Sequence, residues 1–185
     1  QVEMAGPEAV SQSESSYYKE LVKTIEHIIN NRGLDVCFIP HILQDLNAIN
    51  SIMELLDERL TRNHITVAPC IQGDDGADFI FSIYKGSELV VGTRYHANVC
   101  SVAMGKKSIG LVALNRVKYM YDSIDMKGAY VMISDGFSAQ LCKKIDRLIS
   151  TGSSVYKDTV MSQFKDKKAQ SLSTYRSAIY QLMKI

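Results

Sequence analysis

A permanent cation, a phenol and an imidazole stand next to one another in the sequence at Arg94, Tyr95 and His96, shortly after an apolar run at residues 89–91. A Gly-Thr pair separates the run from the triplet, which is typical of a buried strand that ends in a turn. In an open parallel sheet, ligands bind beyond the carboxyl ends of the strands, where helix N-termini offer free N–H groups to anions. A guanidinium and an imidazole at that place predict an anion site. A structural role, with a salt-bridged arginine and a packed histidine, is the alternative.

The segments around this triplet alternate between strand and helix patterns. A helix at residues 97–105 is apolar nearly all round and must be buried, so its N-terminus would point at the same crevice. Strands are expected at residues 35–40, 65–68, 89–93, 108–114 and 129–133, and further helices at 17–31, 49–60, 79–84, 115–124 and 138–149. This alternation predicts an α/β, doubly wound fold with a mostly parallel sheet of five or six strands flanked by helices. The strands at 35–40 and 89–93 are expected near the centre of the sheet.

Three parts are expected along the chain. Residues 1–16 have the composition of a linker or of a frayed first strand, for which residues 2–5 are the candidate. Residues 17–150 form the α/β lobe. Residues 151–185 include a Gly-Ser-Ser hinge and then apolar positions typical of one long helix or two, so they are expected to form a C-terminal helical extension.

The composition excludes several classes of protein. A net charge of +1 argues against nucleic acid as a partner. No stretch approaches the roughly 18 apolar residues of a membrane helix, and the N-terminal segment lacks a signal-peptide pattern. The four cysteines are too widely spaced for paired metal ligands and indicate a reducing compartment, so a cytoplasmic protein is expected. No two of the four histidines have ligand spacing, so chemistry without a metal or other cofactor is expected.

Two motifs resemble those of a known family. The run VVGTRYHANV resembles the G-T/M-R-L-H-A signature of the polysaccharide pyruvyl transferases, and FIPH at residues 38–41, followed by Asp45, is similar to the strand-ending I-P-H of many members. The resemblance covers roughly residues 17–149, and its specific part is the R-x-H core. Tyr95 stands where leucine is usual, and residues 115–118, which end at Lys118, only loosely match the family's Y-D-x-K.

The resemblance implies a transferase that moves pyruvate from phosphoenolpyruvate onto a sugar of a cell-surface polysaccharide, as a ketal, in exopolysaccharide biosynthesis. It implies a two-lobed enzyme of the GT-B type, in which this chain is the Rossmann-like C-terminal lobe and binds the donor. The N-terminal lobe and a glycan or lipid-linked sugar acceptor are then its partners, and the chain is expected to be inactive alone.

The expected donor carries a carboxylate and a phosphate, and Arg94 can bind either group with two parallel hydrogen bonds. His96 is the expected catalytic residue, either as general acid for the leaving phosphate or by neutralising its charge. Tyr95, Asp45, His41 and Lys118 are the other expected substrate-binding residues. Asp45 and His41 are also the local candidates for a second acid or base, with a helix cap and a packed histidine as the structural alternative. For this site, Arg94 should lack a buried acidic partner.

Two other functions remain open from the sequence. A nucleotide-sugar-binding lobe of a GT-B glycosyltransferase would need a glutamate on the helix after the strand at 89–93 to hold a ribose. Residues 97–105 contain no glutamate. A non-enzymatic, flavodoxin-like binding module of the receiver type would need a phosphorylatable aspartate at a strand end, and neither FIPH nor VVGTRYH supplies one.

Overall fold

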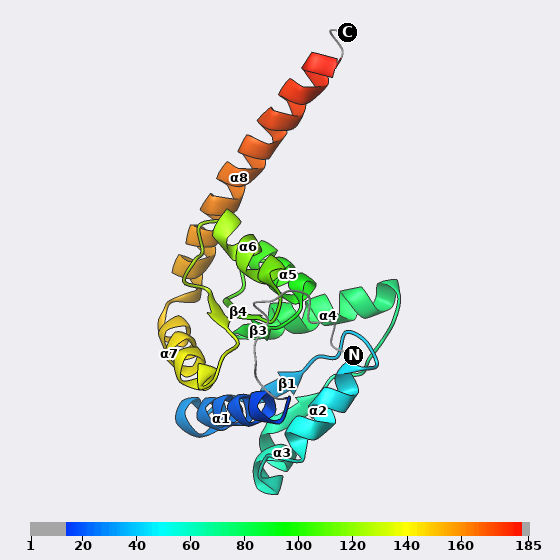
Figure 1. Cartoon of the computed structure of the whole chain (residues 1–185), viewed down its shortest axis with the longest axis vertical. Coiled ribbons are helices and arrows are strands. Elements are labelled where there is room, and N and C mark those ends of the chain that lie inside the picture. The colour runs from blue at the N-terminus through cyan, green and yellow to red at the C-terminus, as the bar shows by residue number, and fades with distance from the viewer. Residues whose placement is uncertain (1–13, 183–185) are drawn as a thin grey trace.

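The computed structural model describes residues 14–182, apart from the side chains of residues 153–155, 157, 159, 164, 168 and 175–182. Helices and strands alternate along most of this length (Figure 1). The elements are α1 (Glu14–Arg32), β1 (Val36–Phe38), α2 (Asp45–Met53), α3 (Glu58–His64), β2 (Ile65–Val67), α4 (Asp74–Gly86), β3 (Val90–Gly92), α5 (Tyr95–Ala103), β4 (Ser108–Val112), α6 (Asn115–Ser123), β5 (Tyr130–Met132), α7 (Phe137–Ser150) and α8 (Ser153–Leu182). The candidate first strand at residues 2–5 lies outside the described residues.

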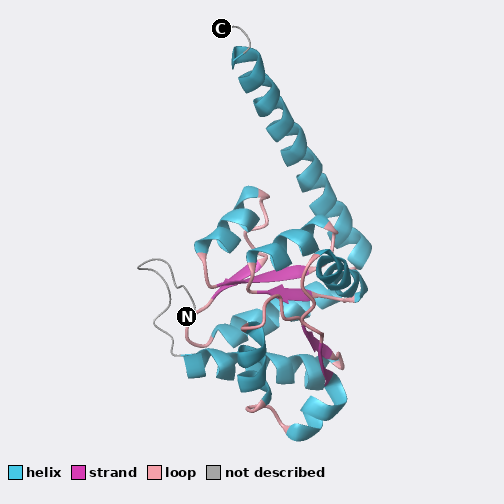
Figure 2. Ribbon diagram, turned by 90° about the vertical axis from the view of Figure 1, so that its right-hand side faces the viewer, coloured by secondary structure: helices cyan, strands magenta, loops and turns pink. Residues whose placement is uncertain are grey.

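The strand pairings found in the described residues are all parallel. β1 pairs with β2, with Val36 opposite Ile65, and β3 and β5 pair with opposite edges of β4. Every position of β4 is buried, whereas β1 and β3 each have one hydrogen-bonded neighbour and a residue exposed at their middle position. Figure 2 shows the strands with helices on either side.

The prediction of a mixed α/β fold with parallel strands flanked by helices is therefore confirmed. The prediction of one continuous sheet is wrong for the described residues, because these strands form a two-stranded and a three-stranded sheet. β3 lies at the edge of its sheet and β1 belongs to the other one, so neither strand is central. Residues of both strands line a cleft that is described below.

The three-stranded sheet is covered on both faces, as a parallel sheet requires. On one face α5, α6 and the start of α8 pack around β4, and on the other face α7 and α1 do so. The largest fully buried side chains of these two layers are Tyr121, Val102, Val112, Val117 and Val160 on the first face and Phe137, Ile109, Leu111, Leu141 and Ile145 on the second.

Two helices begin at places that the sequence pattern did not indicate. The helix expected at residues 49–60 is two helices, because Asp57 adopts an extended conformation and accepts hydrogen bonds from the N–H groups of Arg59 and Leu60, which starts α3. The helix expected at 97–105 begins two residues earlier, at Tyr95. Tyr95 and His96 therefore lie in the first turn of α5.

α8 is a single helix of 30 residues. Its first turns are anchored by Tyr156 and Val160, which are buried against α5 and α6, and its remainder extends away from the body of the molecule (Figure 1). Within residues 14–182, no helix combines the length and the apolar character that crossing a membrane would require.

Candidate functional site

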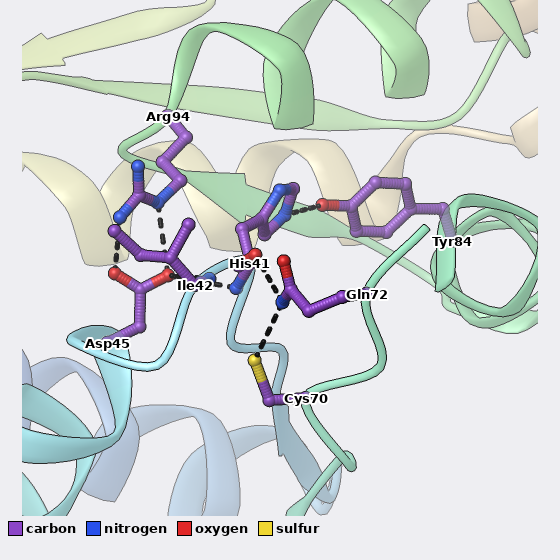
Figure 3. A network of polar contacts seen from close by, with 7 residues as sticks. All are labelled: His41, Ile42, Asp45, Cys70, Gln72, Tyr84 and Arg94. Atoms are coloured by element: carbon purple, nitrogen blue, oxygen red, sulfur yellow. Dashed lines mark hydrogen bonds and ion pairs between the residues drawn. The ribbon is translucent and has the colours of Figure 1, made fainter. Parts of the chain in front are cut away.

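The carboxyl ends of β1 and β3 bring two distant sequence motifs together. After β1 the chain passes through His41 to Asp45, which begins α2, and after β3 it passes through Arg94 to α5. Asp45 and Arg94 bind each other, so the two loops lie side by side at one edge of the fold. The FIPH and GTRYH motifs, more than fifty positions apart in the sequence, thus form one polar cluster (Figure 3).

Arg94 and Asp45 form the central ion pair of this cluster (Figure 3). Nε of Arg94 donates to Oδ2 of Asp45 at 3.1 Å, and Nη2 donates to Oδ1 at 2.5 Å. Oδ2 also accepts from the backbone N–H groups of His41, at 2.9 Å, and Ile42, at 3.2 Å. Burial alone would raise the pKa of Asp45, but these hydrogen bonds and the charge of Arg94 outweigh it and lower that pKa. Asp45 is therefore a carboxylate at neutral pH.

The ion pair corrects the expectation about the partner of Arg94 but leaves part of its guanidinium available to an anion. The expectation that Arg94 lacks a buried acidic partner is wrong in that Asp45, whose side chain is 25% exposed, binds it directly. The contact uses one edge of the guanidinium, formed by Nε and Nη2. A guanidinium has five N–H donors, and the side chain of Arg94 is 38% exposed. The other edge, formed by the two Nη atoms, can still bind an anion with two parallel hydrogen bonds.

His41 is held in the cluster by a buried phenol. Its Nε2 lies 2.8 Å from the hydroxyl of Tyr84, whose side chain is 2% exposed. Burial raises the pKa of Tyr84 far above its usual value, so the hydroxyl keeps its proton. Burial and then the charge of Arg94 lower the pKa of His41; Asp45 acts in the opposite direction, and His96 adds the smallest lowering effect. His41 is thus a neutral imidazole at neutral pH, which suits a general base.

Asn98 fixes the turn that carries Arg94, and sequence reasoning did not single it out. The side chain is fully buried, and its Nδ2 donates to the carbonyl oxygens of Gly92, at 3.0 Å, and Arg94, at 2.8 Å. Its Oδ1 accepts from the hydroxyl of Tyr121 at 2.9 Å. A side chain at position 92 would crowd Asn98, because a Cβ there would lie 3.0 Å from Nδ2. A polar residue in an otherwise apolar helix was the signal that could have identified it.

The ion pair lies at the polar end of a large apolar cleft. The cleft has a volume of about 740 Å³ and separates β1 from β3. Asp45, His41 and Arg94 line it together with apolar side chains of α1 and α7, among them Leu21, Ile25, Ile28, Leu141 and Ile145. Across the described part of the chain, no group of three or more histidine, cysteine, aspartate or glutamate residues has the geometry of a metal site.

Comparison with known proteins identifies the family. A family model of polysaccharide pyruvyl transferases matches residues 5–113, which is more than half of the chain. The chain belongs to the polysaccharide pyruvyl transferase family. No curated protein and no solved structure matches it. The family implies a transferase and a polysaccharide as the partner that accepts the transferred group.

The region shared with the pyruvyl transferase family contains most of the predicted site residues. His41, Asp45, Arg94, Tyr95 and His96 all lie within residues 5–113, whereas Lys118 lies beyond them. The family match covers residues 5–113, whereas the resemblance noted from the motifs covers roughly residues 17–149. The family match therefore includes residues that precede α1 in the sequence.

The remaining predicted residues of this pyruvyl transferase family member diverge from Arg94 in space. His96 is exposed and close enough to His41 for its charge to act on that imidazole. Tyr95 packs against the core beside α6, and its ring lies 5.9 Å from the guanidinium of Arg116 and makes an edge contact with the ring of His96, with 5.8 Å between the ring centroids. Lys118 lies on α6, near enough to Tyr130 for its charge to act on that phenol. The structure thus groups Arg94, Asp45 and His41, places His96 near them and in contact with Tyr95, and places Lys118 apart on α6.

Proposed function

We propose that this chain is the C-terminal, donor-binding lobe of a cytoplasmic polysaccharide pyruvyl transferase that uses phosphoenolpyruvate. The proposal depends on one observation: Arg94 directly precedes α5 and binds Asp45 through Nε and Nη2, which leaves the edge formed by its two Nη atoms with donors for an anion. A helix of nine residues offers its first N–H groups to an anion, and the guanidinium edge offers two further donors. These two sets of donors suit a small molecule with a phosphate and a carboxylate.

In this proposal Asp45 positions Arg94 and does not react. Its two oxygens already accept four hydrogen bonds, and its lowered pKa keeps it ionised. The Nε edge of Arg94 is therefore fixed toward α2, which aims the Nη edge outward. An arginine that is already ordered loses less conformational entropy when the donor binds.

The transfer itself needs an acid and a base. A proton is added to the terminal enol carbon of phosphoenolpyruvate, a sugar hydroxyl attacks the adjacent carbon, and phosphate leaves; a second hydroxyl of the sugar then completes the ketal. His96 is the proposed acid or charge partner for the phosphate, because it is exposed at the N-terminus of α5. His41, a neutral imidazole held by Tyr84, is the local candidate for the base that accepts the proton of the attacking hydroxyl.

The acceptor, a glycan or lipid-linked sugar, would be held largely by a second, N-terminal lobe in a GT-B arrangement. The small number of reactive groups at the cluster supports this part of the proposal. The 185 residues alone should then bind the donor without transferring pyruvate.

Thermal unfolding with candidate ligands tests the proposal. Phosphoenolpyruvate should raise the melting temperature of the chain, because a ligand that binds only the folded state stabilises it. A nucleotide sugar at equal concentration should not, and inorganic phosphate should act more weakly because it lacks the carboxylate. Stabilisation by the nucleotide sugar but not by phosphoenolpyruvate would favour the glycosyltransferase alternative. Pyruvyl transfer by these 185 residues alone would refute the two-lobed arrangement.

A further inference from the structure

Arg116 lies at the same edge of the three-stranded sheet as Arg94. β3 and β4 pair in parallel, and the chain leaves β3 toward Arg94 and α5 and leaves β4 toward Arg116, the second residue of α6. α5 and α6 contact each other (Figure 1), and the buried hydrogen bond from the hydroxyl of Tyr121 to Asn98 joins them. The starts of the two helices are therefore fixed relative to each other.

Arg116 has no acidic partner within the described part of the chain. The residue is exposed, and none of the ion pairs between described residues includes it. Arg94, in contrast, has one edge of its guanidinium occupied by Asp45. An exposed arginine side chain loses conformational entropy when it is ordered. A binding role for Arg116 therefore requires a group that holds it in place.

The ring of Tyr95 is that group. The guanidinium carbon of Arg116 lies over this ring, 5.9 Å from its centroid, within the range of an attractive cation–π contact. Tyr95 is itself held, because it packs against the core beside α6. The contact uses the aromatic face and no hydrogen-bond acceptor, so the N–H groups of Arg116 remain available. Tyr95 thus orders a cation without neutralising it.

His96 contacts the same ring. The two rings meet edge to face, with 5.8 Å between their centroids, and His96 is exposed. One aromatic ring therefore holds a guanidinium and an imidazole near each other. In the motifs that resemble those of the family, Tyr95 stands in the place of a leucine and Arg116 in the place of an aspartate. A leucine offers no aromatic face to a cation, and an aspartate carries the opposite charge. The two departures from the motifs thus contact each other and together create a positive group.

We propose that Arg116, positioned by Tyr95, forms with His96 a phosphate subsite beside the anion site of Arg94. The inference rests on the proposed function only in taking this phosphate to be that of phosphoenolpyruvate. Because Asp45 is paired with Arg94, a donor that carries both a phosphate and a carboxylate needs a further cation. Arg116 supplies it, and its guanidinium can bind a phosphate with two parallel hydrogen bonds. Arg94 is then left for the carboxylate.

Titration with single anions separates the two subsites. The intact chain is titrated with inorganic phosphate, with phosphoenolpyruvate and with pyruvate, which has only the carboxylate, and binding is followed by NMR. Arg116→Gln should weaken binding of the two phosphate ligands by about tenfold or more and leave that of pyruvate unchanged. Arg147→Gln is the matched control, because Arg147 is also exposed and outside the ion pairs of the described residues, in the last turn of α7. It should change none of the three affinities.

The outcomes distinguish this subsite from the proposed function. Failure of inorganic phosphate to bind the unmodified chain, or equal binding by Arg116→Gln, would refute the subsite even if phosphoenolpyruvate binds. An equal loss of pyruvate binding would also refute it, because Arg116 would then act only through its charge. If phosphate binds through Arg116 but phosphoenolpyruvate binds no more tightly than phosphate, the subsite stands and the proposed function fails.

Substitutions of Tyr95 test its positioning role. Tyr95→Phe keeps the ring and should bind phosphate like the unmodified chain, whereas Tyr95→Leu removes the ring and should weaken phosphate binding. In the double variant Tyr95→Leu/Arg116→Gln, the loss of affinity should be close to that of Arg116→Gln alone, because Tyr95 acts through Arg116. Urea unfolding of each variant measures any loss of stability separately. Fully additive losses of affinity, or equal phosphate binding by Tyr95→Leu and Tyr95→Phe, would contradict this role.

Discussion

Replacing Arg94 by lysine separates a binding role from a structural one. Lysine keeps the positive charge but loses the planar fork, so it can replace neither the pair of bonds to Asp45 nor two parallel bonds to a donor. The two side chains of the ion pair are 38% and 25% exposed, and a pair of that kind contributes about 1 kcal/mol or less to folding. Loss of a charge-assisted hydrogen bond to phosphoenolpyruvate costs roughly 1.5 to 3 kcal/mol, or about 10- to 150-fold in Kd.

The measurement compares binding and stability in the same samples. Calorimetric titration with phosphoenolpyruvate gives the change in Kd, and urea unfolding gives the change in the free energy of unfolding. Arg62→Lys is the matched control, because Arg62 forms an ion pair with Glu58 on the exposed surface of α3, away from the cleft. We expect Arg94→Lys to weaken binding strongly with little loss of stability, and Arg62→Lys to change neither. If Arg94→Lys binds the donor as tightly as the unmodified chain but unfolds much more easily, Arg94 is structural and the proposed site is wrong.

Three further predictions concern other parts of the chain. Asn98→Ala should lower the free energy of unfolding by about 3 kcal/mol in urea titrations, because it removes three buried hydrogen bonds, whereas Asn63→Ala at an exposed position should not. The hydrogen bond from Arg32 lowers the pKa of Asp146 to about 2. At a pH above the ordinary carboxyl pKa near 4, the free energy of unfolding should therefore be about 1 kcal/mol higher for the unmodified chain than for Asp146→Asn. Urea titrations should show this difference in free energy shrinking as the pH falls from about 4 toward 2. His96→Ala in the complete two-lobed enzyme should lower kcat by ~10² to 10⁴ if His96 is the general acid, and an unchanged kcat would exclude that role.

The sequence predicted the elements better than their assembly. The periodicity of apolar residues located each strand and most helices within a few residues, because burial of an apolar face dominates local structure. It missed the break between α2 and α3, where Asp57 caps a new helix inside a continuous apolar pattern. It also predicted one sheet, since no local pattern reports which strand edges meet. Edge pairing depends on segments that are distant in the sequence.

The candidate site was predicted as a set of residue types but not as a set of contacts. The two motifs indicated Arg94, His96, His41 and Asp45, and the parallel strands bring their loops together. That Asp45 binds Arg94 could not be read from positions 49 residues apart. Tyr95 begins α5 and packs against the core beside α6, where its ring also contacts that of His96, so it does not join the contacts between Arg94 and Asp45. The buried Tyr84 and Asn98 hold the site; the apolar pattern around Asn98 could have marked it as a buried polar residue, but the sequence does not identify the groups that either side chain binds.

The ion pair determines which groups can attract a dianionic or trianionic donor. Asp45 offsets the charge of Arg94 at about 3 Å, and the lowered pKa of His41 leaves that residue uncharged, so these three side chains sum to no net charge at neutral pH. Arg94 then contributes geometry more than attraction, because its Nη edge selects planar oxygens. In the proposed function, the electrostatic attraction comes largely from the N-terminus of α5. This division of roles would let one arginine pair with a carboxylate in the free protein and still bind the anionic donor.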